Sequence, residues 1–157
     1  MNLDAQCAEY GHAIIQQVLA SLGKSPSEPV EKDVRSDIEN TITKSLGVLQ
    51  ENGVYAFFLF LASRMRNRED RDGKKDAEKV TAYQVDTQMK RLLREDKLKL
   101  LGTEQDDFEA IKRMTNDLDQ LLLARQLIER SLVYARYHAK ALKPPEGEPQ
   151  RQEAATS

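Results

Sequence analysis

The longest apolar run in the chain reads VYAFFLFLA and occupies residues 54–62. Its aromatic side chains would suit a buried strand, and periodicity does not separate strand from helix in a continuous apolar run. Residues 63–66 extend the run to the length of a helix, and the sequence contains no second strand candidate that could pair with it. We therefore predict a helix at 53–66, apolar on nearly all sides, at the centre of a helical bundle.

The composition of the chain agrees with a helical fold. Only 7 Gly and 5 Pro are present among 157 residues, which is too few for the turns of a β-sandwich or a β-barrel. The charged fraction of 32% and the hydrophobic fraction of 39% are typical of helices with wide solvated faces. A chain of this length buries a core without disulfides or metals, so one domain is expected.

Five further segments have apolar residues at helical spacing. They are 4–22, 31–52, 76–101, 104–115 and 117–142. Asp4 is a predicted N-cap of the first helix, and Asn116 or Asp117 is the predicted N-cap of the last. Thr103 and Asp106 resemble a capping box at the start of the shortest helix. The sequence thus predicts an all-α fold, a compact bundle of about five to six helices at 1–142.

The apolar positions of the most hydrophobic helices predict one shared core. Its expected members are Leu46, Phe58, Leu61, Ile128, Leu132 and Ala135. Residues 143–157 have no large apolar side chain and are rich in Pro, Gly, Glu and Gln. We expect them to form a disordered C-terminal tail.

Charge and hydropathy place limits on partners and location. The net charge of −2 gives no global field that would draw the whole chain onto nucleic acid or an anionic membrane. The longest apolar run is far shorter than the ~20 residues that span a bilayer, and Asp4 and Glu9 stand where a signal peptide would be basic and then apolar. We expect a soluble, cytoplasmic protein with no membrane contact. The single cysteine, Cys7, excludes an internal disulfide and is expected to be a buried, inert thiol.

Motifs for catalysis or cofactor binding are not found in the sequence. His12 and His138 are far apart and neither belongs to HExxH, and no two glycines have the spacing of a nucleotide-binding loop. Residues 70–76 resemble a calcium loop, but basic residues interrupt it and the bidentate Glu is missing, which favours a solvated turn. The sequence predicts no enzymatic activity, no cofactor and no metal.

Basic residues gather in two places that could contact phosphate. In the loop after the apolar helix, six basic residues stand among three acidic ones; the basic residues are Arg64, Arg66, Arg68, Arg71, Lys74 and Lys75. Guanidinium groups match phosphate oxygens, although a solvated turn is the alternative interpretation. A third group on 90–97 is diluted by acidic residues and is interpreted as an ordinary surface face.

The last helix carries the second predicted phosphate-binding group. Arg125, Arg136 and Lys140 project within about 60° of one another at 100° per residue, with Glu129 between them. A salt-bridged helix edge is the alternative. Nearby aromatic residues, namely Tyr134, Tyr137 and His138, could stack on bases or could simply cover the edge of the bundle. The predicted RNA-binding residues are Arg64, Arg66, Arg68, Lys74, Arg125, Arg136 and Lys140.

Two stretches resemble a known family. They are the sequence NGVYAFFLFLA at 52–62, which follows an amphipathic helix, and ARQLIERSLVYARYHAKAL at 124–142. Both resemble the small subunit of the type III-B CRISPR (Cmr) RNA-targeting complex, whose last helix has an aromatic residue, then Arg, then small residues. Tyr134, Arg136, Ala139 and Ala141 occupy those places here.

The resemblance, which covers most of residues 4–142, implies a compact helical bundle without catalytic activity. It implies a subunit that stacks head-to-tail with copies of itself and helps to hold guide RNA and target RNA beside the other subunits of the complex. The alternative from the residues alone is a helical adaptor whose charged faces contact only protein.

Overall fold

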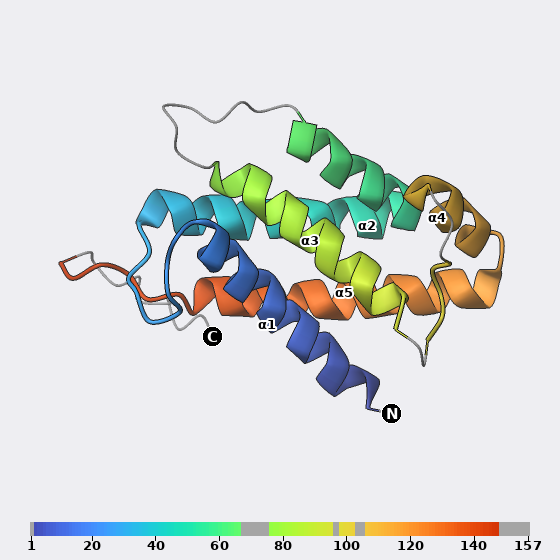
Figure 1. The fold of residues 1–157 in the computed structure, drawn as a ribbon, viewed down its shortest axis with the longest axis horizontal. Coiled ribbons are helices and arrows are strands. Elements are labelled where there is room, and N and C mark those ends of the chain that lie inside the picture. Colours follow the sequence, from blue (N-terminus) through green and yellow to red (C-terminus); the bar gives the residue numbers. More distant parts are fainter. Residues whose placement is uncertain (1, 67–75, 96–97, 103–105, 148–157) are drawn as a thin grey trace.

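The computed structural model describes residues 2–66, 76–95, 98–102 and 106–147, with the side chain of Arg66 excepted. Within these residues the chain forms five helices and no strand (Figure 1). They are α1 (Leu3–Ser21), α2 (Lys32–Arg66), α3 (Ala77–Leu93), α4 (Asp107–Thr115) and α5 (Leu118–Lys140). The prediction of an all-α bundle is confirmed.

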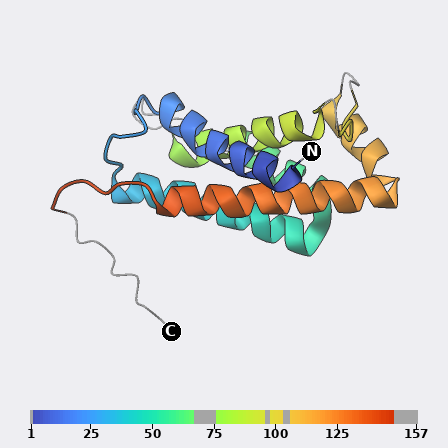
Figure 2. The same ribbon diagram turned by 90° about the horizontal axis from the view of Figure 1, so that it is seen from below.

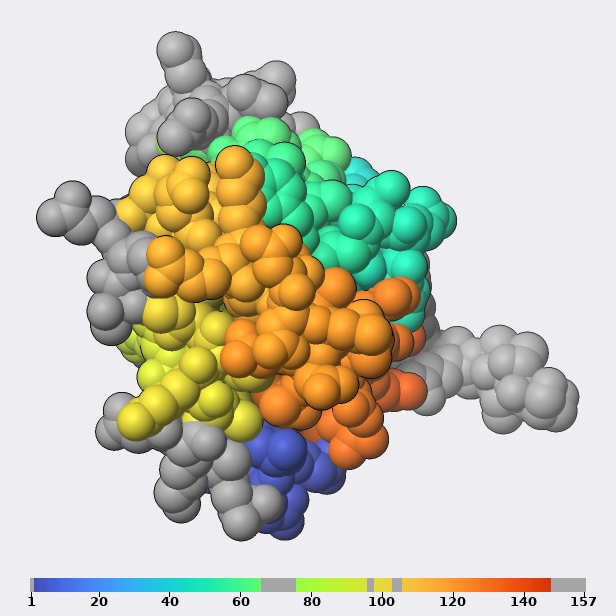
Figure 3. Space-filling model, turned by 90° about the vertical axis from the view of Figure 1, so that its right-hand side faces the viewer, coloured from blue at the N-terminus to red at the C-terminus, as the bar shows by residue number. Residues whose placement is uncertain are grey.

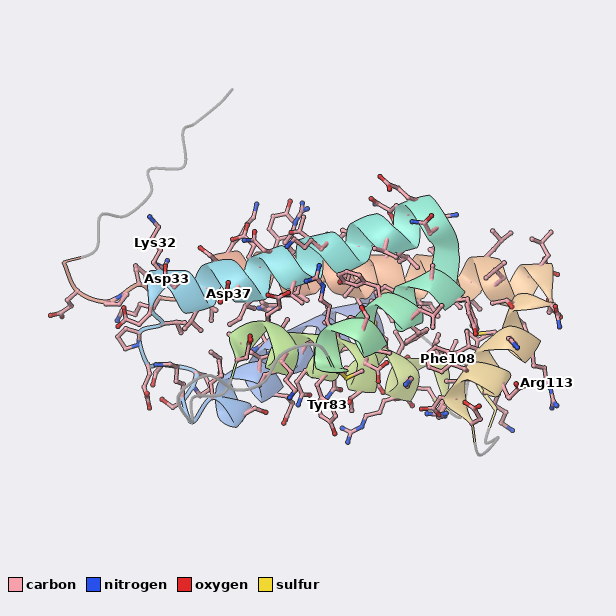
Figure 4. All side chains as sticks on the ribbon, turned by 90° about the horizontal axis from the view of Figure 1, so that it is seen from above. Lys32, Asp33, Asp37, Tyr83, Phe108 and Arg113 are labelled. Atoms are coloured by element: carbon pink, nitrogen blue, oxygen red, sulfur yellow. The ribbon has the colours of Figure 1, made fainter. Side chains whose placement is uncertain are left out.

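Helix α2 consists of two helical segments that meet at Gly53. The backbone of Gly53 has φ 92° and ψ −174°, a conformation that is open in practice only to glycine. Figures 1 and 4 show that the segment after Gly53 folds back alongside the segment before it. The predicted boundary between a helix that ends near Asn52 and a helix at 53–66 is confirmed. The single label α2 therefore covers two of the six predicted helices.

The helices form two layers, which are seen edge-on in Figure 2. α1 and α3 pack against each other in one layer, and the first segment of α2 packs beside α5 in the other. α1 also packs along α5, and α3 packs along α2. α4 contacts both α2 and α5 and covers the end of the bundle at which α2 turns (Figure 3). The core lies between the layers and is closed at that end by α4.

The predicted core residues are all buried. Phe58, Leu61, Ile128, Leu132 and Ala135 have no exposed surface, and Leu46 is 5% exposed. The segment at 53–66 is not enclosed on all sides, however, because Leu59 is 47% exposed. Figure 1 shows this segment at an edge of the bundle rather than at its centre, which corrects the expected position.

The prediction of one helix at 76–101 is wrong at its C-terminal end. α3 ends at Leu93, and the chain turns back so that the amides of Leu100 and Leu101 both donate to the carbonyl of Leu93, at 3.0 and 2.9 Å. Lys99, with a positive φ of 46°, makes this return possible. Leu100 and Leu101 are buried. Their apolar character reflects a loop that returns to the core, and not a further helical turn.

The helix caps differ from the prediction at two of the three N-termini for which a cap was predicted. Asn2, and not Asp4, caps α1 by accepting from the amide of Ala5 at 3.1 Å. Asp106 caps α4 by itself, so this helix begins at Asp107; Thr103 lies outside the described residues. At the third, Asp117 caps α5 as predicted, and Asp76, for which no cap was predicted, caps α3; both side chains accept from backbone amides.

The C-terminal segment begins with one contact to the bundle. The carbonyl of Lys143 accepts a hydrogen bond from the amide of Val30 at 2.9 Å. Residues 143–147 are not helical, and residues 148–157, which make up most of the predicted tail, lie outside the described part of the chain.

One helix of the described chain, between Lys32 and Met65, is long and apolar enough by length and composition alone to cross a membrane. Its path reverses at Gly53, and two of its three phenylalanines, Phe57 and Phe58, are fully buried in the bundle. The core helix of a soluble protein passes the same test. The finding is therefore compatible with a soluble chain.

Candidate nucleic-acid interface

The three basic residues that the sequence predicts on the last helix lie along the side of α5 that faces α2. A terminal nitrogen of Arg125 donates to the carbonyl oxygen of Gln50 at 2.9 Å. Further along, Nζ of Lys140 lies 3.9 Å from Oε1 of Glu39. Arg136 is between them in sequence and within about 20° of Arg125 around the helix. We call the line formed by Arg125, Arg136 and Lys140 the α5 seam.

Acidic groups lie beside the α5 seam, and one of them forms an ion pair with it. Glu129 accepts a hydrogen bond from Nε2 of Gln50 at 3.1 Å, next to the contact that Arg125 makes with the same residue. The Lys140–Glu39 pair is exposed, with 44% and 30% of the two side chains accessible. An exposed ion pair at the outer limit of contact contributes little free energy. Lys140 is therefore able to exchange Glu39 for another anion at small cost.

Arg136 differs from its two neighbours on the seam. Its side chain is half-buried, and its Nε is shielded from solvent without a hydrogen-bond partner. Within the described residues no carboxylate forms an ion pair with it. A guanidinium group has five N–H donors and is favoured beside an anionic acceptor. Arg136 is thus a cation that the described fold leaves without a neutralising partner.

Of the loop group, the structure describes only the side chain of Arg64. Arg64 forms an ion pair with Glu78 at 2.9 Å, and its guanidinium carbon lies 5.0 Å from the ring centroid of Phe60. The side chain of Arg66 and the whole of Arg68 and Lys74 lie outside the described residues. Arg64 joins α2 to α3, a contact that neither the phosphate interpretation nor the solvated-turn interpretation of this group predicted.

The loop group and the α5 seam do not meet in one track. The end of α2, which carries Arg64, lies across the bundle from α5, on the far side of α3 in Figure 1. A single strand that followed the α5 seam would have to cross the bundle to reach Arg64. The α5 seam is therefore a separate basic surface from the loop group.

The three aromatic candidates on α5 have different surroundings. The hydroxyl of Tyr134 lies 3.0 Å from both carboxylate oxygens of Asp4, which raises the pKa of Tyr134. His138 stacks on His12 of α1, with ring centroids 4.5 Å apart and an angle of 22° between the planes. Tyr137 is 61% exposed. Tyr137 is the most exposed of the three, whereas Tyr134 and His138 are partly buried.

Two members of the basic group at 90–97, Lys90 and Arg94, form ion pairs that hold the fold together, whereas Lys97 lies outside the described residues. Nζ of Lys90 lies 2.9 Å from Asp86 and 3.1 Å from Asp107, and Arg94 donates to Asp107 at 2.6 Å. Burial raises the pKa of Asp86, although Lys90 opposes the shift. At Asp107 partial burial also acts to raise the pKa, but the hydrogen bonds from Arg94 and Lys90 outweigh it and lower the pKa. These contacts connect α3 to the start of α4, and we call them the Lys90 clamp.

The pairing of His12 with His138 is a feature that sequence spacing did not reveal. The two residues belong to α1 and α5, and the helices bring them together across most of the chain. Within the described residues no group of three or more His, Cys, Asp or Glu side chains could hold a metal ion. Cys7 is buried as expected; its Sγ donates to the carbonyl of Leu127 at 3.6 Å, and burial raises its pKa.

No protein-family model matches this chain, and no curated protein matches it.

Proposed function

We propose that the chain is a non-catalytic RNA-binding subunit of a ribonucleoprotein, of the kind represented by the small subunit of the type III-B CRISPR complex. Two features support the proposal. The all-α bundle is the fold that the resemblance implies. The observation that carries the proposal is Arg136, a half-buried arginine on the predicted RNA-binding helix that lacks an acidic partner among the described residues.

In this role the subunit stacks with copies of itself, contacts the other subunits of a cytoplasmic antiviral complex, and helps to hold guide and target RNA. A single copy has a net charge of −2 and little long-range attraction for RNA. Alignment of copies would bring successive α5 seams into one row. Binding by the isolated chain is therefore expected to be weak, and binding by the assembly is expected to be stronger.

The first experiment is purification of the tagged protein from its host. The eluate is expected to contain RNA of defined length and several larger protein partners. Nuclease treatment is expected to remove the RNA while the protein partners stay bound. An eluate that contains neither RNA nor partner proteins contradicts the proposal.

The second experiment measures how RNA binding depends on salt. If Arg125, Arg136 and Lys140 each contact a phosphate, the slope of log affinity against log salt is about −2.1 for a single strand. That slope corresponds to about an 18-fold loss of affinity between about 50 and 200 mM salt.

A pair of double variants tests whether RNA binding depends on the seam residues or only on the total positive charge of the chain. Arg136→Gln with Lys140→Gln is expected to reduce RNA retention by the complex and to make the salt slope shallower by about 1.4. The control, Lys112→Gln with Arg113→Gln on α4, removes the same charge elsewhere and is expected to leave RNA retention and the salt slope unchanged. Equal effects of the two double variants would show that the seam has no special role.

The alternative function is a helical adaptor without nucleic-acid contact. Leu118 and Leu122, one turn apart on α5, are 66% and 53% exposed, which is an arrangement that suits a protein partner. An eluate with stoichiometric protein partners and no RNA would favour the adaptor, provided that the seam double variant also leaves the salt dependence of RNA binding unchanged.

A further inference from the structure

The exposed aromatic side chains of the described bundle are few. Tyr137 on α5 is 61% exposed and Tyr83 on α3 is 55% exposed. Most of the large apolar residues are enclosed, so a tyrosine ring with more than half of its surface in water is not part of the core.

Tyr137 lies next to the basic residues of the α5 seam. Arg136 directly precedes it, and Lys140 follows three residues later on the same side of the helix. Arg136 has no acidic partner among the described residues, and Lys140 has only the exposed 3.9 Å pair with Glu39. One helical turn thus combines an accessible aromatic face with two cations that are available to an anion.

This combination matches the chemistry of a nucleotide in a single strand. An unpaired base presents a π-face that stacks on an aromatic side chain, and the phosphates on either side of it attract Arg and Lys. A base within a duplex has both faces covered by its neighbours and is not available for such stacking.

We propose that Tyr137 is a stacking platform for one unpaired nucleobase, and that Arg136 and Lys140 hold the phosphates that flank this base. The inference rests on the proposed function, because it specifies how the α5 seam contacts nucleic acid. It adds that the ligand is single-stranded at this position. Either RNA or DNA offers the shared chemistry of an unpaired base with flanking phosphates.

Photocrosslinking tests the position of the base directly. A single-stranded RNA of about twelve residues with one 5-iodouridine is irradiated with the wild-type protein at low salt, and the crosslinked peptide is identified by mass spectrometry. The crosslink is expected at Tyr137. Tyr137→Phe is expected to keep the crosslink, and Tyr137→Ala is expected to lose it. A crosslink in wild type that maps to other residues and persists in Tyr137→Ala overturns the inference.

Binding measurements supply the matched control. Fluorescence anisotropy with the same strand is expected to show at least about a fivefold loss of affinity for Tyr137→Ala and little change for Tyr137→Phe. Tyr83→Ala removes an equally exposed tyrosine from the α1–α3 side of the bundle (Figure 4) and is expected to bind like wild type. Equal affinities of Tyr137→Ala and wild type overturn the inference.

Two further ligands identify the type of nucleic acid that binds, and the outcomes separate this inference from the proposed function. A single-stranded DNA of matched sequence shows whether the 2′-hydroxyl matters, and a blunt duplex is expected to bind more weakly and without dependence on Tyr137. If wild type binds RNA and Tyr137→Ala binds it equally well, the stacking role is wrong and the proposed function is retained. No binding of any strand, alone or in the assembly, overturns both.

Discussion

Gly11 lies where α1 and α5 pack closely against each other. A Cβ at this position would lie 2.7 Å from the carbonyl oxygen of Ser131, 2.7 Å from Cβ of Tyr134 and 2.9 Å from the amide nitrogen of Ala135. Two of these three atoms are backbone atoms, so no side-chain rotation relieves the contact. The two helices pack this closely only because residue 11 has no side chain.

Substitution of Gly11 is therefore expected to destabilise the protein. Gly11→Ala forces α1 and α5 apart and is expected to lower the free energy of unfolding by about 1–3 kcal/mol, despite the better helix propensity of Ala. Gly47→Ala is the control, because nothing lies within 4 Å of its Cβ. Gly47→Ala is expected to stabilise the protein by about 0.5–1 kcal/mol. Urea unfolding of both variants checks the opposite signs.

His138 gives the protein a predictable response to pH. Burial, with a smaller contribution from His12, lowers the pKa of His138 in the folded state. The folded protein then binds fewer protons than the unfolded chain, whose histidines titrate near pH 6.5. The contribution of His138 to stability is fully present above that pH, and it decreases as the pH falls through 6.5 toward the lower pKa of the folded state.

His138→Gln is expected to remove this part of the pH dependence. Between about pH 7.5 and 5.5, the free energy of unfolding should decrease less in His138→Gln than in wild type. His12→Gln leaves the larger cause, burial, in place and is expected to keep most of the decrease. Chemical denaturation at several pH values measures the difference, and parallel curves for wild type and His138→Gln would contradict it.

At the scale of elements, the Lys90 clamp fixes α4 against α3. The side chains of Lys90 and Asp86 are only 15% and 11% exposed, so their pair is poorly screened by water. Asp107 is more exposed and binds Lys90 and Arg94 together. Removal of the ammonium group would leave the carboxylate of Asp86 buried without its cation.

Lys90→Met is expected to lower the free energy of unfolding by about 3 kcal/mol at neutral pH. The loss should shrink at acid pH, because Asp86 becomes neutral when it is protonated and its pKa is already raised by burial. Lys112→Met removes a lysine that is 60% exposed, at 3.9 Å from Glu109, and is expected to cost less than about 0.5 kcal/mol. Thermal or urea unfolding at two pH values compares the variants.

The elements that could be predicted from sequence are those whose boundaries depend on local chemistry. Gly53 ends one helix and begins the next because of its own φ, and Asp117 caps α5 through the amide three residues later. The end of α3 could not be predicted in this way. Leu100 and Leu101 are apolar at helical spacing, but their amides bond to Leu93 in a return loop that long-range packing selects.

The position of the candidate site on α5 could be predicted from the sequence, but the partners of its residues could not. Helical geometry places Arg125, Arg136 and Lys140 on one side of α5, and this placement is observed. Their partners, Gln50 and Glu39, belong to α2, and the sequence of α5 holds no information about them. Which of the three cations keeps an unneutralised charge is therefore a result of tertiary packing.

For the whole molecule, the boundary of the folded domain can be tested at its C-terminal end. Truncation after Lys143 keeps the hydrogen bond from Val30 to the Lys143 carbonyl and all of α5. It is expected to change the free energy of unfolding by less than about 0.5 kcal/mol. Truncation after Tyr137 removes buried Ala139 and half-buried Leu142 and is expected to lower the melting temperature clearly. Calorimetry of the two truncations distinguishes a dispensable tail from a docked one.

The packing of α1 against α5 joins the two ends of the described fold, and this has a consequence for synthesis on the ribosome. Cys7 and its partner Leu127 are 120 positions apart in the chain. At about 5–20 residues per second, about 6–24 s pass between the synthesis of α1 and the synthesis of the part of α5 that packs against it. During this interval the nascent chain exposes Ile14, Ile15 and Val18, which are buried in the finished protein. α1 is therefore the segment on which a chaperone is expected to act while translation is still under way.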